Sequence, residues 1–142
     1  MSVPLHPTIY LQQRGPMVRL LVCGDRNWTC KETISKFIRD LGGIECIIEG
    51  EARGADSVAR DIGLALGLRV LKFPASWEKY GRAAGMLRNR QMLEDGKPTF
   101  LVAFHDAIAS SKGTKHMVNL AKAHGVPGVV INSRGQTVET WE

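Results

Sequence analysis

Two groups of residues in the sequence have the types and spacing of an anion-binding site. The first group shares one face of a predicted helix, at positions i, i+3, i+4 and i+7: Gly85, Arg88, Asn89 and Met92. The second is a run of small and hydrogen-bonding residues just before the next predicted helix: Ser110, Ser111, Lys112, Gly113 and Thr114. An arginine supplies a permanent charge with planar donors, and a helix start supplies unpaired amides. Together they predict a phosphate or nucleotide-sugar site. A solvated helix face, on which Arg88 pairs with a surface carboxylate, stays open as an alternative.

A third group of candidates follows the first predicted strand. Gly24 allows the backbone to approach a ligand, Arg26 carries charge, and Asp25 and Asn27 have the oxygens and amide that bind ribose hydroxyls. The segment lacks the GxGxxG pattern of dinucleotide-binding proteins. An ordinary turn before a helix therefore stays open as an alternative for Asp25 and Asn27. Trp28 either stacks on a base or covers the sheet.

The loop after the second predicted strand holds the remaining candidates. Gly54 precedes a helix whose first amides would point at an anion, and Asp56 either caps that helix or binds sugar hydroxyls. Glu49 and Glu51 would repel a nearby phosphate, so they are expected to face a ribose or solvent.

The elements that must position these residues alternate along the chain. Five short apolar runs read as buried parallel strands, at residues 18–23, 45–48, 68–73, 99–104 and 128–131. Helical patterns lie between them, the first with Thr29 and Glu32 placed as a capping box. This alternation predicts an α/β fold: a Rossmann-like open parallel sheet of about five strands with helices on both faces. Ligands bind such sheets beyond the carboxyl ends of the strands.

The 142 residues suffice for one domain, which we place at residues 17–142. Residues 1–16 are expected to form a flexible N-terminal arm, because Pro4, Pro7 and Pro16 interrupt it and no strand or helix period appears. Two alternatives stay open for this arm. It is dispensable to a domain that starts at Met17, or it is exchanged between the subunits of a dimer.

Charge and cysteine content limit the classes of function. The formal net charge is +5, but the 19 basic residues are scattered, so a small anionic ligand explains the excess as well as nucleic acid does. Cys23, Cys30 and Cys46 form no CxxC pair and suit a reduced, cytoplasmic protein. The four histidines lack metal-ligand spacing, so neither a metal nor another cofactor is expected. No apolar stretch is long enough to cross a membrane.

Several spaced motifs together resemble one known family. They occupy residues 24–28, 54–56, 73–77, 80–92 and 113–117. The chain is similar over residues 18–132 to the YspA, or YpsA-related, branch of the SLOG superfamily. This resemblance implies a Rossmann-like nucleotide-binding fold, related to the Lonely Guy phosphoribohydrolases and more distantly to DNA-processing protein A.

The resemblance also identifies a departure that bears on catalysis. In the Lonely Guy enzymes an arginine and a glutamate serve N-glycosidic cleavage, and Arg88 matches that arginine. The glutamate positions correspond to His116 and Met117 here. Cleavage through an oxocarbenium-like state usually needs a carboxylate. Asp25, Asp56 or Asp106 would have to supply it.

We therefore expect a protein that binds a nucleotide or nucleotide sugar, with hydrolysis of its N-glycosidic bond as an open question. Arg88, Asp25 and Asp56 are the catalytic candidates. A non-catalytic sensor with the same pocket is the first alternative, and a single-stranded DNA-binding module is the second. A homodimer is expected, because the predicted helix at residues 80–94 has apolar side chains on more than one face.

Overall fold

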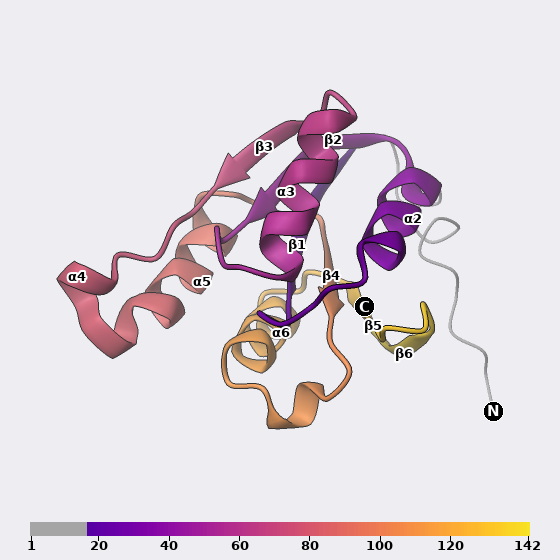
Figure 1. Ribbon diagram of the computed structural model, residues 1–142. Coiled ribbons are helices and arrows are strands. Elements are labelled where there is room, and N and C mark those ends of the chain that lie inside the picture. The colour runs from indigo at the N-terminus through magenta and orange to yellow at the C-terminus, as the bar shows by residue number, and fades with distance from the viewer. Residues whose placement is uncertain (1–16) are drawn as a thin grey trace.

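A six-stranded sheet organises the molecule (Figure 1). The computed structural model describes residues 17–142, so the expected arm at residues 1–16 lies outside the described residues. The strands are β1 (Val18–Gly24), β2 (Ile44–Glu49), β3 (Arg69–Lys72), β4 (Phe100–Phe104), β5 (Gly128–Ile131) and β6 (Thr137–Trp141). Their order across the sheet is β3-β2-β1-β4-β5-β6. The α/β, Rossmann-like class predicted from the sequence is confirmed.

The sequence predicted about five strands, and the sheet has six. The first five strands are parallel to their neighbours, as expected, but β6 pairs antiparallel with β5 at the sheet edge. Burial along β6 alternates between half-buried and exposed. A short, half-exposed edge strand carries no continuous apolar run, which is why the search for buried strands missed it.

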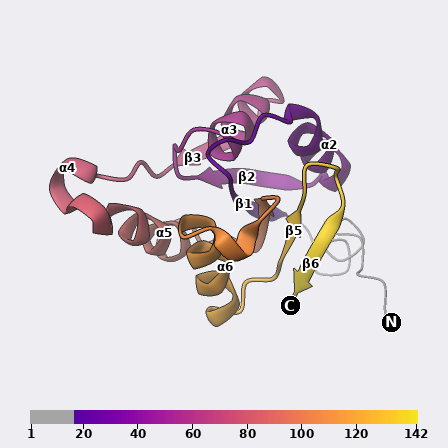
Figure 2. The same cartoon turned by 60° about the horizontal axis from the view of Figure 1, so that its bottom comes forward.

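Helices cover both faces of the sheet, as Figure 2 shows edge-on. The long helices are α2 (Lys31–Leu41), α3 (Ala55–Ala65), α5 (Ala84–Glu94) and α6 (Gly113–Ala123). The short ones are α4 (Trp77–Tyr80), η1 (Gly81–Ala83) and η2 (Ile108–Ser110). Residues of α2 and α3 pack into one core cluster, and residues of α5 and α6 into another. No helix among residues 17–142 is long and apolar enough to span a membrane.

The alternation of side chains along β1 divides the core between these two faces. Leu20 and Val22 lie in the cluster with α2 and α3, whereas Leu21 and Cys23 lie in the cluster with α5 and α6. Successive residues of a strand point to opposite faces, so a strand covered on both faces must be apolar throughout. The unbroken apolar run of β1 follows from its central place.

The expected capping box of α2 is absent. The cap residue is Cys30, no side chain caps the helix, and Thr29 is exposed. The Cys30 carbonyl instead accepts hydrogen bonds from Trp28 Nε1 at 2.8 Å and Thr33 Oγ1 at 2.9 Å. Trp28 itself is buried against Phe104, with ring centroids 5.7 Å apart. Burying this indole fixes the turn before α2, so Trp28 belongs to the core rather than to a base-stacking surface.

The strand order places a switch point beside β1. From β1 the chain moves outward through β2 and β3, then returns to place β4 on the other side of β1. The loops after β1 and β4 therefore diverge toward opposite faces of the sheet. Ligands of open α/β sheets bind in the crevice that opens between such loops.

Candidate functional site

A pocket of about 430 Å³ lies at this switch point. Its walls come from the end of β1 and the loop that follows, the loop before α3, one face of α5, and the start of α6. Ten of the residues selected from the sequence line it: Gly24, Asp25, Arg26, Asn27, Asp56, Arg88, Asn89, Ser111, Gly113 and Thr114. Segments distant in the sequence are thus brought together around one cavity.

Gly54, also selected as a ligand-binding residue, does not line the pocket. A side chain at Gly54 would collide with the Asp25 carbonyl and the Arg26 backbone, and its φ of 80° favours glycine. The next amide, of Ala55, donates to the Asp25 carbonyl at 3.1 Å. Gly54 therefore joins the loop before α3 to the loop after β1.

The loop after β1 is held in place by backbone contacts. A side chain at Gly24 would meet the Phe104 carbonyl and Ala55, so only glycine fits between β4 and α3. The Asp25 amide donates to the Phe104 carbonyl at 2.9 Å, and Asp25 Oδ1 accepts from the Asn27 amide at 2.9 Å. One oxygen of Asp25 thus forms a turn, as the structural alternative predicted, while its residue still lines the pocket.

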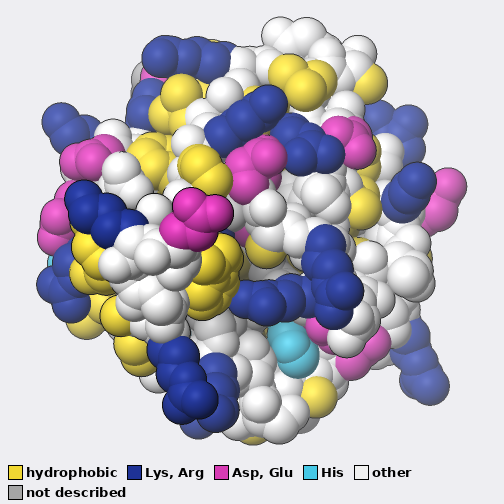
Figure 3. Space-filling view, turned by 60° about the vertical axis from the view of Figure 1, so that its left-hand side comes forward, with side chains coloured by type: hydrophobic (Ala, Val, Ile, Leu, Met, Phe, Trp, Pro, Cys, Tyr) yellow, Lys and Arg dark blue, Asp and Glu magenta, His cyan; other side chains and the backbone are white. Residues whose placement is uncertain are grey.

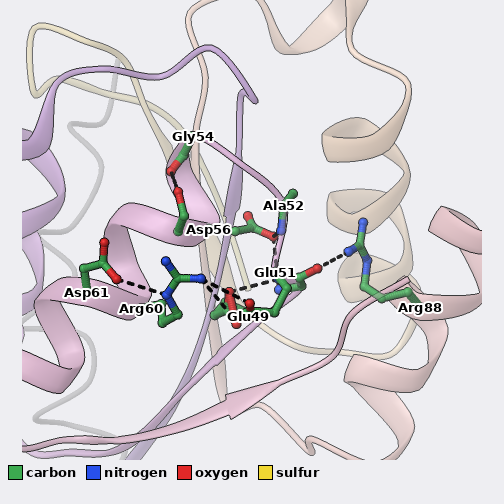
Figure 4. Close-up of polar contacts among 10 residues, drawn as sticks. Glu49, Glu51, Ala52, Gly54, Asp56, Arg60, Asp61 and Arg88 are labelled. Carbon is green, nitrogen blue, oxygen red and sulfur yellow. Dashed lines mark hydrogen bonds and ion pairs between the residues drawn. The ribbon is translucent and has the colours of Figure 1, made fainter. Parts of the chain in front are cut away.

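Asp56 is a buried carboxylate on the pocket wall. Only 5% of the residue is exposed, and its Oδ2 accepts from the Gly50 amide at 3.0 Å and the Ala52 amide at 3.5 Å (Figure 4). Burial raises the pKa of Asp56 to about 6, and the charge of Arg88 opposes that rise. A carboxyl group with this pKa exchanges a proton near neutral pH.

Arg88 faces the interior from α5, as its predicted helix face requires. Its Nη1 donates to the Gly50 carbonyl (Figure 4), and its Nε donates to Asn89 Oδ1 at 3.1 Å. Burial lowers the pKa of Arg88, and the Asp56 charge counters that effect. The Gly50 amide donates to Asp56, and the Gly50 carbonyl accepts from Arg88, so this one residue contacts both charged side chains.

Asn89 fixes the distance between α5 and α6. It is 5% exposed, and its Nδ2 lies 3.3 Å from the Gly113 carbonyl and 3.0 Å from His116 Nδ1. Burial lowers the pKa of His116, with the Arg90 charge adding to the effect. The neutral ring that this favours can accept from the Asn89 amide. Asn89 thus positions the start of α6 against Arg88.

The start of α6 has the form of an anion-binding turn. Ser111 Oγ accepts from the Thr114 amide at 3.0 Å, which orders the turn before Gly113. The first amides of a helix have no acceptor within the helix, and they lie at the positive end of its dipole. Lys112 adds a charged, exposed side chain to the same wall of the pocket.

Glu49 corrects an expectation. It does not face solvent but is fully buried at the end of β2, and it does not line the pocket. Its Oε1 accepts from the Glu51 amide at 2.9 Å, whereas its Oε2 has no partner within residues 17–142. Burial raises the pKa of Glu49 to about 8, and Glu51 contributes to the rise. Arg60 Nη1 binds the Glu51 carboxylate at 3.1 Å.

Asp106, proposed as a substitute carboxylate, lies away from the pocket. Its Oδ1 accepts from the Ser133 amide at 2.7 Å, and this bond lowers the pKa of Asp106. The side chain therefore holds the turn between β5 and β6. Of the three candidate carboxylates, Asp25 and Asp56 line the pocket and Asp106 does not.

Several pocket residues were not selected from the sequence. They are Cys23, Ala52, Arg53, His105 and Met117, whereas Met92 and Lys112, which belong to the two groups named from the sequence, also line the pocket. Arg53 and His105 had a usable signal, because each follows a predicted parallel strand within the loops expected to form the site. Burial strongly raises the pKa of Cys23, which makes its thiol a poor nucleophile. Within residues 17–142 no group of three or more His, Cys, Asp or Glu could hold a metal.

Comparison with known proteins places the chain in a family. It is 34% identical over 128 residues to the Gene 61 protein of Mycobacterium phage D29, and the match covers 82% of this chain and 96% of the phage protein. The chain belongs to the Gene 61 protein family. No family model matches the chain, and no solved structure matches it. The name Gene 61 protein states no chemistry.

Proposed function

We propose that the protein binds a nucleotide or nucleotide sugar in the pocket at the switch point. The observation that supports this most is the joint placement of Arg88 and the start of α6 on one cavity of about 430 Å³. Cavities of this size commonly hold small ligands. Arg88 supplies a positive charge that lies near the Asp56 carboxylate, and the helix start supplies amide donors.

The phosphate of the ligand binds between these two groups. The Gly113 amide and the Thr114 hydroxyl lie at the start of α6, in a turn that the bond from the Thr114 amide to Ser111 Oγ already orders. Charge-assisted hydrogen bonds to phosphate are the stronger class in proteins. Asp25, Asn27 and Asp56 supply the polar groups that bind sugar hydroxyls on the opposite wall.

Titration calorimetry with AMP and with ribose 5-phosphate tests this proposal. Arg88→Ala is expected to weaken binding of both about ten- to hundredfold, because a hydrogen bond to a charged group contributes roughly 1.5–3 kcal/mol. Arg90→Ala is the matched control, since Arg90 is exposed on the same helix and does not line the pocket. No binding to the unmodified protein, or equal affinity in a folded Arg88→Ala variant, would contradict the proposal.

Hydrolysis of the N-glycosidic bond is a second candidate function, favoured by one observation. Asp56 is a buried pocket carboxyl group with a pKa of about 6, in the range of a general base at neutral pH. Its carboxylate would take a proton from a water that attacks the anomeric carbon while the bond to the base breaks, and Asp56 would then return that proton to the departing base. Against this, Met117 occupies one position where the related hydrolases carry a glutamate.

Release of free base from nucleoside monophosphates, followed by chromatography, separates the two candidates. A hydrolase would release base, and Asp56→Asn would lower the rate at least a hundredfold while AMP still binds. A sensor would bind AMP without release. Asp25→Asn is the comparison, because Asp25 lines the same pocket but is half-exposed. Release that continues unchanged in Asp56→Asn would remove Asp56 from the reaction.

We also propose that the chain is a SLOG-type protein that acts in the cytoplasm as a homodimer. The strand order and the pocket at the switch point are compatible with that superfamily. All three cysteines are free thiols, in keeping with a reducing compartment.

A further inference from the structure

A second cavity, of about 340 Å³, adjoins the pocket. Four residues line both cavities: Arg26, Ala52, Arg53 and Arg88. The remaining walls come from the loop after β2 and from residues 74–77, which lead into α4. Figure 1 shows α4 projecting beyond the rest of the molecule on this side. The second cavity is thus a separate space that is reached across a border of three arginines.

The border between the cavities is positively charged and open. Arg26 and Arg53 are exposed, and neither forms an ion pair with a carboxylate in the described part of the chain. The nearby Glu51 carboxylate is paired with Arg60 instead. Figure 3 shows Lys and Arg side chains crossing the middle of this face beside hydrophobic ones. Arg26 and Arg53 therefore add two positive charges next to Arg88, which is more positive charge than a single phosphate at α6 requires.

The outer wall of the second cavity carries an aromatic side chain. Trp77 is 49% exposed, and the Arg26 guanidinium lies 5.8 Å from its ring centroid. A half-exposed indole beside free arginines offers a stacking surface for an aromatic base, because every base has a π-face. Trp28 and Trp141 lie outside both cavities, so Trp77 alone could take this role among the tryptophans.

We propose that the ligand is a nucleoside diphosphate sugar or another pyrophosphate-bridged nucleotide that spans both cavities. Its base stacks on Trp77, one phosphate binds Arg26 and Arg53, and the other phosphate and its sugar occupy the pocket at α6. This inference rests on the proposed function and narrows its ligand class. It assigns the second cavity to the base and the arginine border to the pyrophosphate.

The two halves of one molecule provide the test. ADP-ribose is the probe, and AMP and ribose 5-phosphate are its halves, so calorimetry with all three compares the affinity of the whole ligand with that of each half. We expect ADP-ribose to bind at least tenfold more tightly than either half. UDP-glucose, with a pyrimidine base, then shows whether the Trp77 surface prefers purines.

Variants at the second cavity sharpen this test. Trp77→Ala and Arg53→Ala should each weaken ADP-ribose binding about tenfold, in the range of alanine substitutions at base-stacking and phosphate-binding side chains. Trp77→Ala should leave the affinity for ribose 5-phosphate unchanged, because Trp77 lines only the second cavity. Tyr80→Ala and Arg82→Ala are the matched controls, because both residues are exposed nearby and line neither cavity. Quenching of tryptophan fluorescence by ADP-ribose should be lost in Trp77→Phe.

The failures of the two proposals are distinguishable. If none of the three probes binds, the proposed function itself is wrong. If ribose 5-phosphate binds and ADP-ribose binds no more tightly, the spanning ligand is wrong and the pocket remains. If Trp77→Ala weakens ribose 5-phosphate as much as ADP-ribose, Trp77 does not contact a base and the inference is also overturned.

Discussion

Glu49 shows how a single residue couples the site to pH. It is fully buried, its Oε2 has no partner within residues 17–142, and its pKa is raised to about 8. A carboxyl group whose pKa is higher in the folded than in the unfolded chain stabilises the fold below its unfolded value of 4.5, and this contribution is lost as the pH rises to about 8. Ionisation would leave a negative charge buried beside Asp56.

We therefore expect the melting temperature to fall between pH 5 and pH 9. Glu49→Gln, which is neutral at every pH, should flatten this dependence and raise the melting temperature at pH 9 by about 5 °C or more. Calorimetric melting curves across the pH range measure the effect. Glu94→Gln is the control, because Glu94 is exposed at the end of α5. A Glu49→Gln variant that melts with the same pH dependence as the unmodified protein would contradict the argument.

Residue types in the sequence predicted which loops form the site better than what each side chain does there. The pattern at residues 85–92 left open whether its face is turned inward or solvated, and the structure turns it inward, with Asn89 and Met92 buried and Arg88 half-buried. The sequence could not reveal that Gly54 serves chain packing, because that role depends on the Asp25 carbonyl, which another element supplies. Glu49 was misplaced for the same reason: its surroundings come from α3 and the loop after β2.

At the scale of elements, one side chain, that of Asn89, sets the distance between α5 and α6. Asn89→Ala removes the contacts with Gly113 and His116, leaves the Gly113 carbonyl without this donor, and frees Arg88 Nε. We expect it to destabilise the protein by about 1–3 kcal/mol in urea unfolding and also to weaken AMP binding.

His116→Ala is the matched comparison for this variant. It removes one partner of Asn89 and leaves the bond to the Gly113 carbonyl, so its effect on stability should be smaller. An Asn89→Ala variant of unchanged stability would show that packing, not this amide, sets the distance between the two helices.

Strands β1, β2, β4 and β5 were predictable because each is a largely apolar run in the interior of the sheet, whereas β3, also expected to be buried, is a half-exposed edge strand that begins and ends on the exposed Arg69 and Lys72. Strand β6 had a weaker signal: Gly135 lies in the turn before it, with a φ of 79°, and its side chains alternate in burial. The capping box failed because Trp28 buries its indole and fixes the turn before α2. Local patterns thus predict elements that pack through an apolar surface. They fail where a single tertiary contact determines the local conformation.

The whole molecule leaves apolar side chains on the outside of α5. Met86 is 58% exposed and Leu87 43% exposed. We expect a dimer by light scattering at micromolar concentration, with this face buried between the subunits. Leu87→Glu should then yield a monomer, whereas Leu64→Glu, on an exposed position of α3, should not. A monomeric mass for the unmodified protein would contradict the expectation.

The pairing of β1 with β4 also bears on the order in which the molecule can assemble. Strands β1, β2 and β3 are close in the chain, but the contact of Arg19 with Thr99 joins residues 80 positions apart. While the chain is being synthesised, β1 is an open edge until residues 100–104 have emerged, with an apolar strand and unpaired backbone groups exposed. Closing so long a loop is slow compared with local pairing. The pocket is therefore completed late, and only a chain that has joined both halves of its sheet has the complete cavity.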